Sequence, residues 1–165
     1  MSLNVNNDKD CIDEKTEYEV KKYVKKVEDI AKLSIMKMGS SKHIKSVEEL
    51  SIYQFKRGLD NSEFGKRYTQ LQNIEKLPIT WFELQASCCV LIDNEVNGLV
   101  LVHKHSEEEL EIVLIYSSAE SDKLDIVRMI KMTLESICNN YKPETELVIR
   151  YSSLEEEQLF SRIFQ

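Results

Sequence analysis

Residues 86–118 read Ala-Ser-Cys-Cys-Val-Leu-Ile-Asp-Asn-Glu-Val-Asn-Gly-Leu-Val-Leu-Val-His-Lys-His-Ser-Glu-Glu-Glu-Leu-Glu-Ile-Val-Leu-Ile-Tyr-Ser-Ser. The stretch contains three short runs of Val, Ile and Leu, separated by the polar groups 93–95 and 106–109. Short β-prone runs broken by turn residues are typical of antiparallel strands joined by hairpins. The stretch therefore predicts a three-stranded antiparallel meander. Gly98, just inside the second strand, indicates a bulge or a close approach of backbone.

The residues that follow predict a helix, a strand and a second helix. Apolar residues recur at helical spacing over 121–141, with Ser121 or Asp122 as the cap, and Pro143 ends the helix. A strand follows over 146–151, and Ser153-Leu-Glu-Glu156 has the spacing of a capping box that opens the last helix. Since a strand-helix-strand connection is right-handed, the last strand is expected to lie parallel to the third meander strand. The predicted fold class is α/β (α+β), with a mixed sheet.

The first half of the chain reads as helical. Residues 1–12 are polar and are expected to be a disordered leader, so a single domain is expected over 13–165. Apolar residues at steps of three to five predict a helix over 13–38, ended by Gly39. Ser46 and Glu49 form a capping-box pattern that predicts a helix running to Gly58, and another is expected over 62–77. The run 79–84 is either a separate strand or the lead into the meander.

Composition describes an ordinary soluble domain. Of the 165 residues, 42% are hydrophobic and 31% charged, and no run approaches the roughly 20 apolar residues that cross a bilayer. The N-terminus lacks an export signal, so a cytoplasmic location without membrane attachment is expected. The four cysteines have no metal-site or redox spacing. Cys88 and Cys89 are neighbours in a strand, so they are expected to point to opposite faces as buried thiols.

The net charge of −7 is unevenly distributed. Residues 1–80 carry 15 Lys/Arg and 13 Asp/Glu, whereas residues 81–165 carry 7 and 16, a net charge of −9. An acidic second half repels phosphate backbones, which argues against binding to nucleic acid.

The order of these elements resembles the core of the GNAT-type N-acetyltransferases over roughly residues 45–165. Two local segments support the resemblance: Val96-Asn-Gly98-Leu-Val is similar to the family's second meander strand, and Ser153–Phe164 is similar to its Asn-x-x-Ala-x-x-Leu-Tyr-x-x-x-Gly-Phe segment. The resemblance implies acetyl-CoA as the cofactor, held where the third meander strand and the following parallel strand part. It also implies that the pyrophosphate binds amides at the start of the next helix, where free N–H groups attract anions.

The loop at that position departs from the family pattern. It consists of Ser117, Ser118, Ala119, Glu120, Ser121 and Asp122, with no glycine, no basic residue and two acids. Acids at the start of a helix are also ordinary caps. Phe160 stands where the family has a tyrosine that protonates the departing thiolate.

Candidate catalytic groups follow from the same resemblance. Glu111 and Glu83 are the candidate bases, although a solvent-facing strand glutamate is the simpler expectation, and Tyr151 is a candidate acid. His103 and His105 share a strand face near Glu107 and Glu109, but no third ligand at firm spacing predicts a metal site.

The family continues into two further strands, whereas this sequence stops at Gln165. Either the sequence is part of a longer chain or a neighbour supplies those strands, and an unpaired sheet edge would favour a homo-oligomer or protein partner.

The sequence leaves three candidate functions. The first is a GNAT-like binding or regulatory module without catalysis, and the second is an active acetyl-CoA-dependent N-acetyltransferase. The third is a structural interaction domain that packs its helical N-terminal third on a partner.

Overall fold

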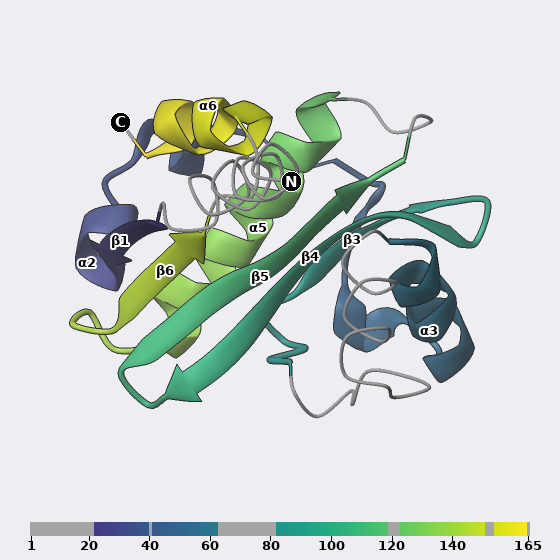
Figure 1. Ribbon diagram of the computed structural model, residues 1–165, viewed down its shortest axis with the longest axis horizontal. Helices are drawn as coiled ribbons and strands as arrows, with labels where there is room; N and C mark the ends of the chain where they lie inside the picture. Colours follow the sequence, from purple (N-terminus) through teal and green to yellow (C-terminus); the bar gives the residue numbers. More distant parts are fainter. Residues whose placement is uncertain (1–21, 40, 63–81, 119–122, 151–153, 165) are drawn as a thin grey trace, which may run out of the picture.

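A six-stranded mixed sheet forms the centre of the molecule (Figure 1). A computed structural model describes residues 22–39, 41–62, 82–118, 123–150 and 154–164. The strands lie in the order β1-β6-β5-β4-β3-β2. Their bounds are β1 Lys22–Lys26, β2 Ile44–Ser46, β3 Cys88–Ile92, β4 Glu95–Ser106, β5 Glu109–Ser117 and β6 Glu146–Arg150.

The predicted meander is confirmed as β3, β4 and β5, which pair antiparallel in sequence order. The turn between β3 and β4 has two residues, Asp93 and Asn94, with φ of 52° and 64°. Two consecutive positive φ values belong to the tight hairpin turn whose twist matches that of the flanking strands, and Asp and Asn tolerate this conformation.

The predicted crossover is also confirmed. Helix α5, Lys123–Asn140, connects β5 to β6, and the two strands run parallel. Helix α6, Leu154–Ile163, follows β6. The fold is therefore a mixed α/β sheet with an antiparallel meander, a crossover helix and a parallel strand, as the sequence predicted.

The two faces of the sheet carry separate apolar clusters. Cys88 belongs to the cluster covered by α2 (Val27–Ile30), α5 and α6, whereas Cys89 belongs to the cluster covered by α3 (Ile52–Asn61). This confirms that the adjacent thiols point to opposite faces. Figure 1 shows α5 behind the sheet and α3 beside β3 and β4.

Gly98 fulfils both roles predicted for it. The pairing of β3 with β4 shifts register beside it, so that Asn97 is the extra residue of a bulge. A Cβ at Gly98 would lie 2.9 Å from Cε of Met129 in α5 and 3.1 Å from the carbonyl oxygen of Tyr116 in β5. Glycine at this position therefore lets α5 pack closely on the sheet.

The predicted N-terminal helix is wrong over its described part. Residues 22–26 form β1, α2 spans only Val27–Ile30, and a 3-10 turn covers Ser34–Lys37. Pairing with β6 satisfies the backbone of β1, and Tyr23 stacks on Phe164 with ring centroids 5.2 Å apart. The apolar residues of this segment that resembled a helical stripe, Val27, Ile30 and Ile35, are buried against the sheet and α5 instead.

The edge of β6 that was expected to be open is occupied by β1. All five residues of β1 pair antiparallel with β6, from Lys22–Arg150 to Lys26–Glu146. The edge strand at this side of the sheet is therefore β1. It carries three lysines, and lysine on an edge strand opposes pairing with a further strand.

The first capping box is present but opens a shorter element than predicted. Ser46 and Glu49 cap a 3-10 turn over Val47–Glu49, and a second capping box, Ser51 with Gln54, opens α3. The helix predicted over 62–77 lies outside the described residues. Of the run 79–84, Phe82 forms an isolated bridge with His103, so the described end of that run lies against β4.

Candidate functional site

The parallel pairing of β5 with β6 covers the first half of β5. It runs from Glu109–Glu146 to Ile112–Ile149, one residue before the end of β6, and β5 continues for five residues beyond it. A bulge lies at the point where the pairing ends, because the pairing of β4 with β5 jumps from Leu101–Leu114 to Val102–Ile112 and leaves Val113 as an extra residue. A bulge bends its strand and increases the local twist. Within the described residues, the second half of β5 therefore has no pairing to β6, and this is where the resemblance implies an opening.

The first two residues of the predicted cofactor loop are tied to β4. The Ser118 amide donates to the Asn97 carbonyl oxygen at 2.8 Å, and the Ser118 hydroxyl donates to Asn97 Oδ1 at 2.9 Å. Ser117 is the last residue of β5. Ala119, Glu120, Ser121 and Asp122 lie outside the described residues, as does the candidate acid Tyr151.

Sequence reasoning did not identify Arg128, which lies near the start of α5. One of its terminal nitrogens lies 3.6 Å from Oδ1 of Asp125, and the Asp125 carboxylate is buried. The Nε atom of Arg128 is buried without a hydrogen-bond partner among the described residues. A buried guanidinium nitrogen normally has an acceptor, so the Nε atom of Arg128 is an exception within the described part of the chain.

Glu111 is buried rather than solvent-facing, which corrects the simpler expectation for this residue. It is 7% exposed, and its Oε1 lies 2.8 Å from Nε2 of His105. His103 lies opposite Glu111 across the strand pair, and its ring meets that of His105 edge to face with centroids 4.6 Å apart. The shared face of the two histidines is thus confirmed, and the carboxylate is held by an internal contact.

Glu83 belongs to a different network, and its amide donates to the Val102 carbonyl oxygen of β4 at 2.7 Å. Its Oε1 accepts a hydrogen bond of 2.7 Å from the Tyr141 hydroxyl, and Lys104 Nζ lies 4.0 Å away. Burial, followed by the bond to Glu83, raises the pKa of Tyr141 to about 12. Glu83 therefore fixes the end of α5 to the segment before β3, and the structure does not bring it together with Glu111.

Phe160, at the position of the family's proton-donating tyrosine, is packed into the core. It is 1% exposed and stacks with Phe164 at a centroid distance of 6.1 Å. A buried phenyl ring has no group that can donate a proton.

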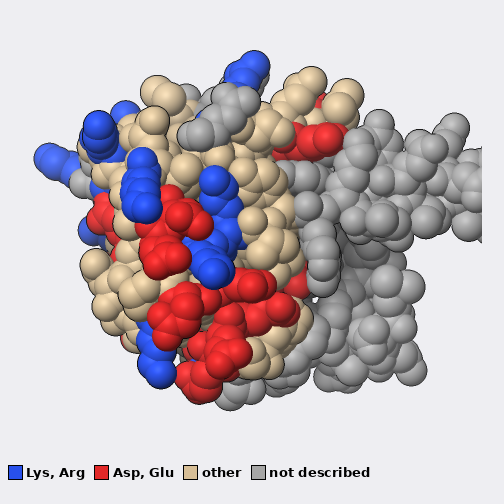
Figure 2. Space-filling view, turned by 90° about the vertical axis from the view of Figure 1, so that its left-hand side faces the viewer, with Lys and Arg blue, Asp and Glu red and all other residues tan. Residues whose placement is uncertain are grey.

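Acidic side chains gather at the end of the sheet where β4 turns into β5. Glu109 lies beside Glu146 in the parallel pair, and Glu108 accepts the Glu146 amide through its carbonyl oxygen. Figure 2 shows a continuous acidic area on the face that contains this end of the sheet, with basic side chains beside it. This part of the surface would repel an anionic ligand.

The described part of the chain was also searched for a metal site and for a membrane-spanning helix. Within it, no three His, Cys, Asp or Glu side chains are grouped so as to hold a metal ion. No helix there combines the length and apolar character needed to span a membrane.

Comparison with known proteins gives little further information. No protein-family model and no curated protein matches the chain. Among solved structures, the chain is similar to one described as the C-terminal domain (DUF2156) of a lysylphosphatidylglycerol synthetase from Agrobacterium fabrum, with a TM-score of 0.39 and 10% identity. The similarity covers 92% of this chain and 42% of that one. A TM-score this low assigns neither fold family nor function.

Proposed function

We propose that this chain is a GNAT-like domain that acts as a binding or regulatory module and does not catalyse acetyl transfer. The observation that carries the proposal is the pair of bonds between Ser118 and Asn97. The Ser118 amide is the first of those through which the loop would bind a pyrophosphate, and it already donates to the Asn97 carbonyl oxygen at 2.8 Å. Binding a phosphate there would require this bond to break.

The groups expected to transfer protons support the same proposal. Phe160 has no hydroxyl and lies in the core. Glu111 is buried and bound to His105, so it would have to leave that partner before accepting a proton from an amine. A general base needs to lie within hydrogen-bond reach of the proton that it removes.

Calorimetric titration with acetyl-CoA, together with thermal unfolding in its presence, tests this proposal. A ligand that binds the folded state raises the free energy of unfolding by about 2.7 kcal/mol at a hundred times its dissociation constant. We expect neither heat of binding nor a shift of the melting temperature at about millimolar acetyl-CoA. Saturable binding would contradict the proposal.

Acetyl-CoA-dependent N-acetyl transfer is the second candidate, and Arg128 favours it. Within the described residues, the stretch of β5 beyond Ile112 has no pairing to β6, and Arg128, in the helix that follows the loop, carries a positive charge that the loop itself lacks. If this function holds, acetyl-CoA stabilises the wild-type protein, and Arg128→Gln removes most of that stabilisation. Arg162→Gln changes an exposed arginine in the last turn of α6 and is the matched control.

A structural domain that docks its N-terminal third on a partner is supported least. Val27 and Ile30 are buried within the domain, so the apolar side of this segment is already used. A homo-oligomer or protein partner would have to use another surface, and sedimentation velocity over a range of concentrations tests for self-association.

A further inference from the structure

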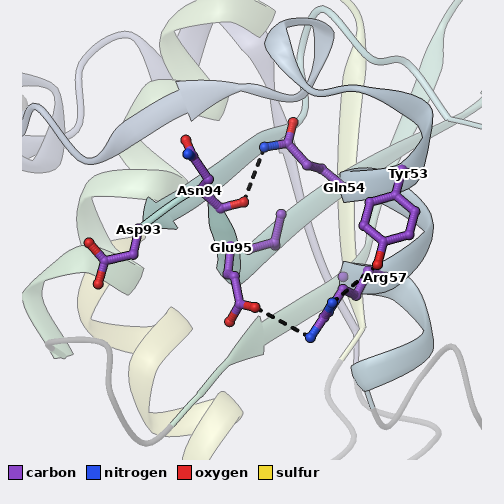
Figure 3. Close-up of a pocket in the computed structure, with 8 residues that line it drawn as sticks. Tyr53, Gln54, Arg57, Asp93, Asn94 and Glu95 are labelled. Carbon is purple, nitrogen blue, oxygen red and sulfur yellow. Dashed lines mark hydrogen bonds and ion pairs between the residues drawn. The ribbon is translucent and has the colours of Figure 1, made fainter.

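A hollow lies between α3 and the turn that joins β3 to β4 (Figure 3). Its volume is about 260 Å³. Gly58 of α3 and Val96 of β4 both line it and pack closely, since a Cβ at Gly58 would be 2.9 Å from Cγ1 of Val96. This close contact gives the hollow an apolar floor.

Two polar contacts hold the rim of the hollow in place. On one side, Gln54 Nε2 donates to the Asn94 carbonyl oxygen at 3.1 Å, while its Oε1 accepts the Ser51 amide in the capping box. On the other side, an Arg57 nitrogen lies 3.3 Å from Glu95 Oε1. Figure 3 shows these two contacts on opposite sides of the hollow, with Tyr53 on the side of α3. These contacts position the rim groups around the hollow.

The charges of Arg57 and Glu95 largely cancel, because the two side chains are paired with each other. The second carboxylate, that of Asp93, points away from α3 (Figure 3). A neutral ligand that carries several hydroxyl groups does not compete for either charge of the pair and can bond to the amide, carboxylate and guanidinium groups of the rim.

Tyr53 adds an exposed aromatic surface. The residue is 69% exposed, and its hydroxyl accepts a hydrogen bond from Arg57 at 3.2 Å, which fixes the ring beside the hollow. A large aromatic side chain left in water and held in one position is a ready surface for the apolar face of a ligand.

From these features we propose that the hollow binds a neutral sugar ring. The C–H face of the ring would lie against Tyr53 and Val96, and its hydroxyls would bond to Gln54, Arg57 and Glu95. A sugar ring combines an apolar face with a polar edge and is of a size that the hollow accommodates. This inference is independent of the function proposed above.

Titration of the full-length, 15N-labelled protein with free sugars tests the inference by NMR. The probes are glucose, galactose, mannose and N-acetylglucosamine, with glucosamine and glucuronate as the cationic and anionic analogues. We expect saturable shifts of the Gln54, Arg57 and Glu95 signals with at least one neutral sugar. We also expect about tenfold weaker binding of both charged analogues.

Substitutions locate the binding site. Tyr53→Ala and Arg57→Ala should each abolish the shifts, whereas Ile52→Ala, at an equally exposed neighbour that does not line the hollow, should leave them unchanged. Unchanged melting temperatures establish that each variant is folded. The inference is overturned if no sugar causes shifts up to about 50 mM, if a charged analogue binds as well as its neutral parent, or if the shifts persist in Tyr53→Ala.

Discussion

The carboxylate of Glu111 is buried in the sheet, and the stability of the protein is expected to depend on the groups that bond to it. His105, 2.8 Å away, is one of its partners and is more exposed than Glu111 itself. We expect His105→Ala to lower the free energy of unfolding by about 1 kcal/mol, because a buried carboxylate that loses a hydrogen bond is poorly solvated. Urea unfolding measures this change. His43→Ala, at an exposed histidine, is the control, and equal stability of the two variants would show that the contact contributes nothing.

The buried thiols predict a loss of stability at alkaline pH. Burial raises the pKa of Cys88 to about 11 and, with a smaller effect from Cys88 itself, that of Cys89 to about 12. The folded state therefore keeps these protons when the unfolded state releases them. The contribution is complete below about pH 8.5 and is lost as the pH rises toward the folded pKa values.

Urea midpoints at about pH 8 and about pH 10 measure this loss. Cys89→Ala should show a smaller decrease between the two values than the wild-type protein. Identical decreases would mean that Cys89 is not protonated in the folded state at the higher pH, contrary to the expectation.

For single residues, the sequence predicted which face of the sheet a side chain points to better than it predicted which residue that side chain contacts. Strand alternation was sufficient to place Cys88 and Cys89 on opposite faces and the two histidines on one face. The partner of Ser118 was not predictable, because Asn97 lies 21 residues earlier and meets it through a bulge. Arg128 carried no local signal either, since the burial of its Nε without a partner among the described residues is a property of the packed structure.

Among the elements, the contact between α5 and the sheet depends on Gly98. We expect Gly98→Ala to destabilise the protein by about 1–3 kcal/mol, because the added methyl group has backbone on one side and Met129 on the other. Gly39→Ala is the matched control, since no atom lies within 4 Å of a Cβ at that position. Thermal and urea unfolding compare the two variants, and similar stabilities would contradict the close packing.

The elements that sequence predicted correctly are those whose pattern and partners are local. The strands β3, β4 and β5 are joined by short turns, so alternation and turn residues were sufficient. Residues 22–26 were predicted as helix because the apolar residues around them recur at helical spacing. Their actual partner, β6, lies about 120 residues later in the chain, and such distant pairing overrides local preference.

For the molecule as a whole, β1 protects the edge of the sheet. We expect removal of residues 1–26 to uncover the β6 edge and to cause concentration-dependent self-association, because β6 has no lysine and presents an open row of backbone groups. Sedimentation velocity measures the assembly state. Removal of residues 1–21 keeps β1 and serves as the control.

Monomeric behaviour of the shorter chain, with a native circular dichroism spectrum, would contradict this expectation. Association of both truncated chains would instead assign the effect to residues before Lys22.

The pairing of β1 with β6 also imposes an order on biosynthesis. The ribosome makes β1 about 120 residues before its partner, which corresponds to about 6 to 24 seconds at ordinary rates of translation. During that interval Tyr23 has no Phe164 to meet, although the two join in the finished protein through the Tyr23 hydroxyl and the Phe164 carbonyl oxygen. The nascent N-terminal segment therefore cannot make these contacts until the ribosome has synthesised β6 and Phe164.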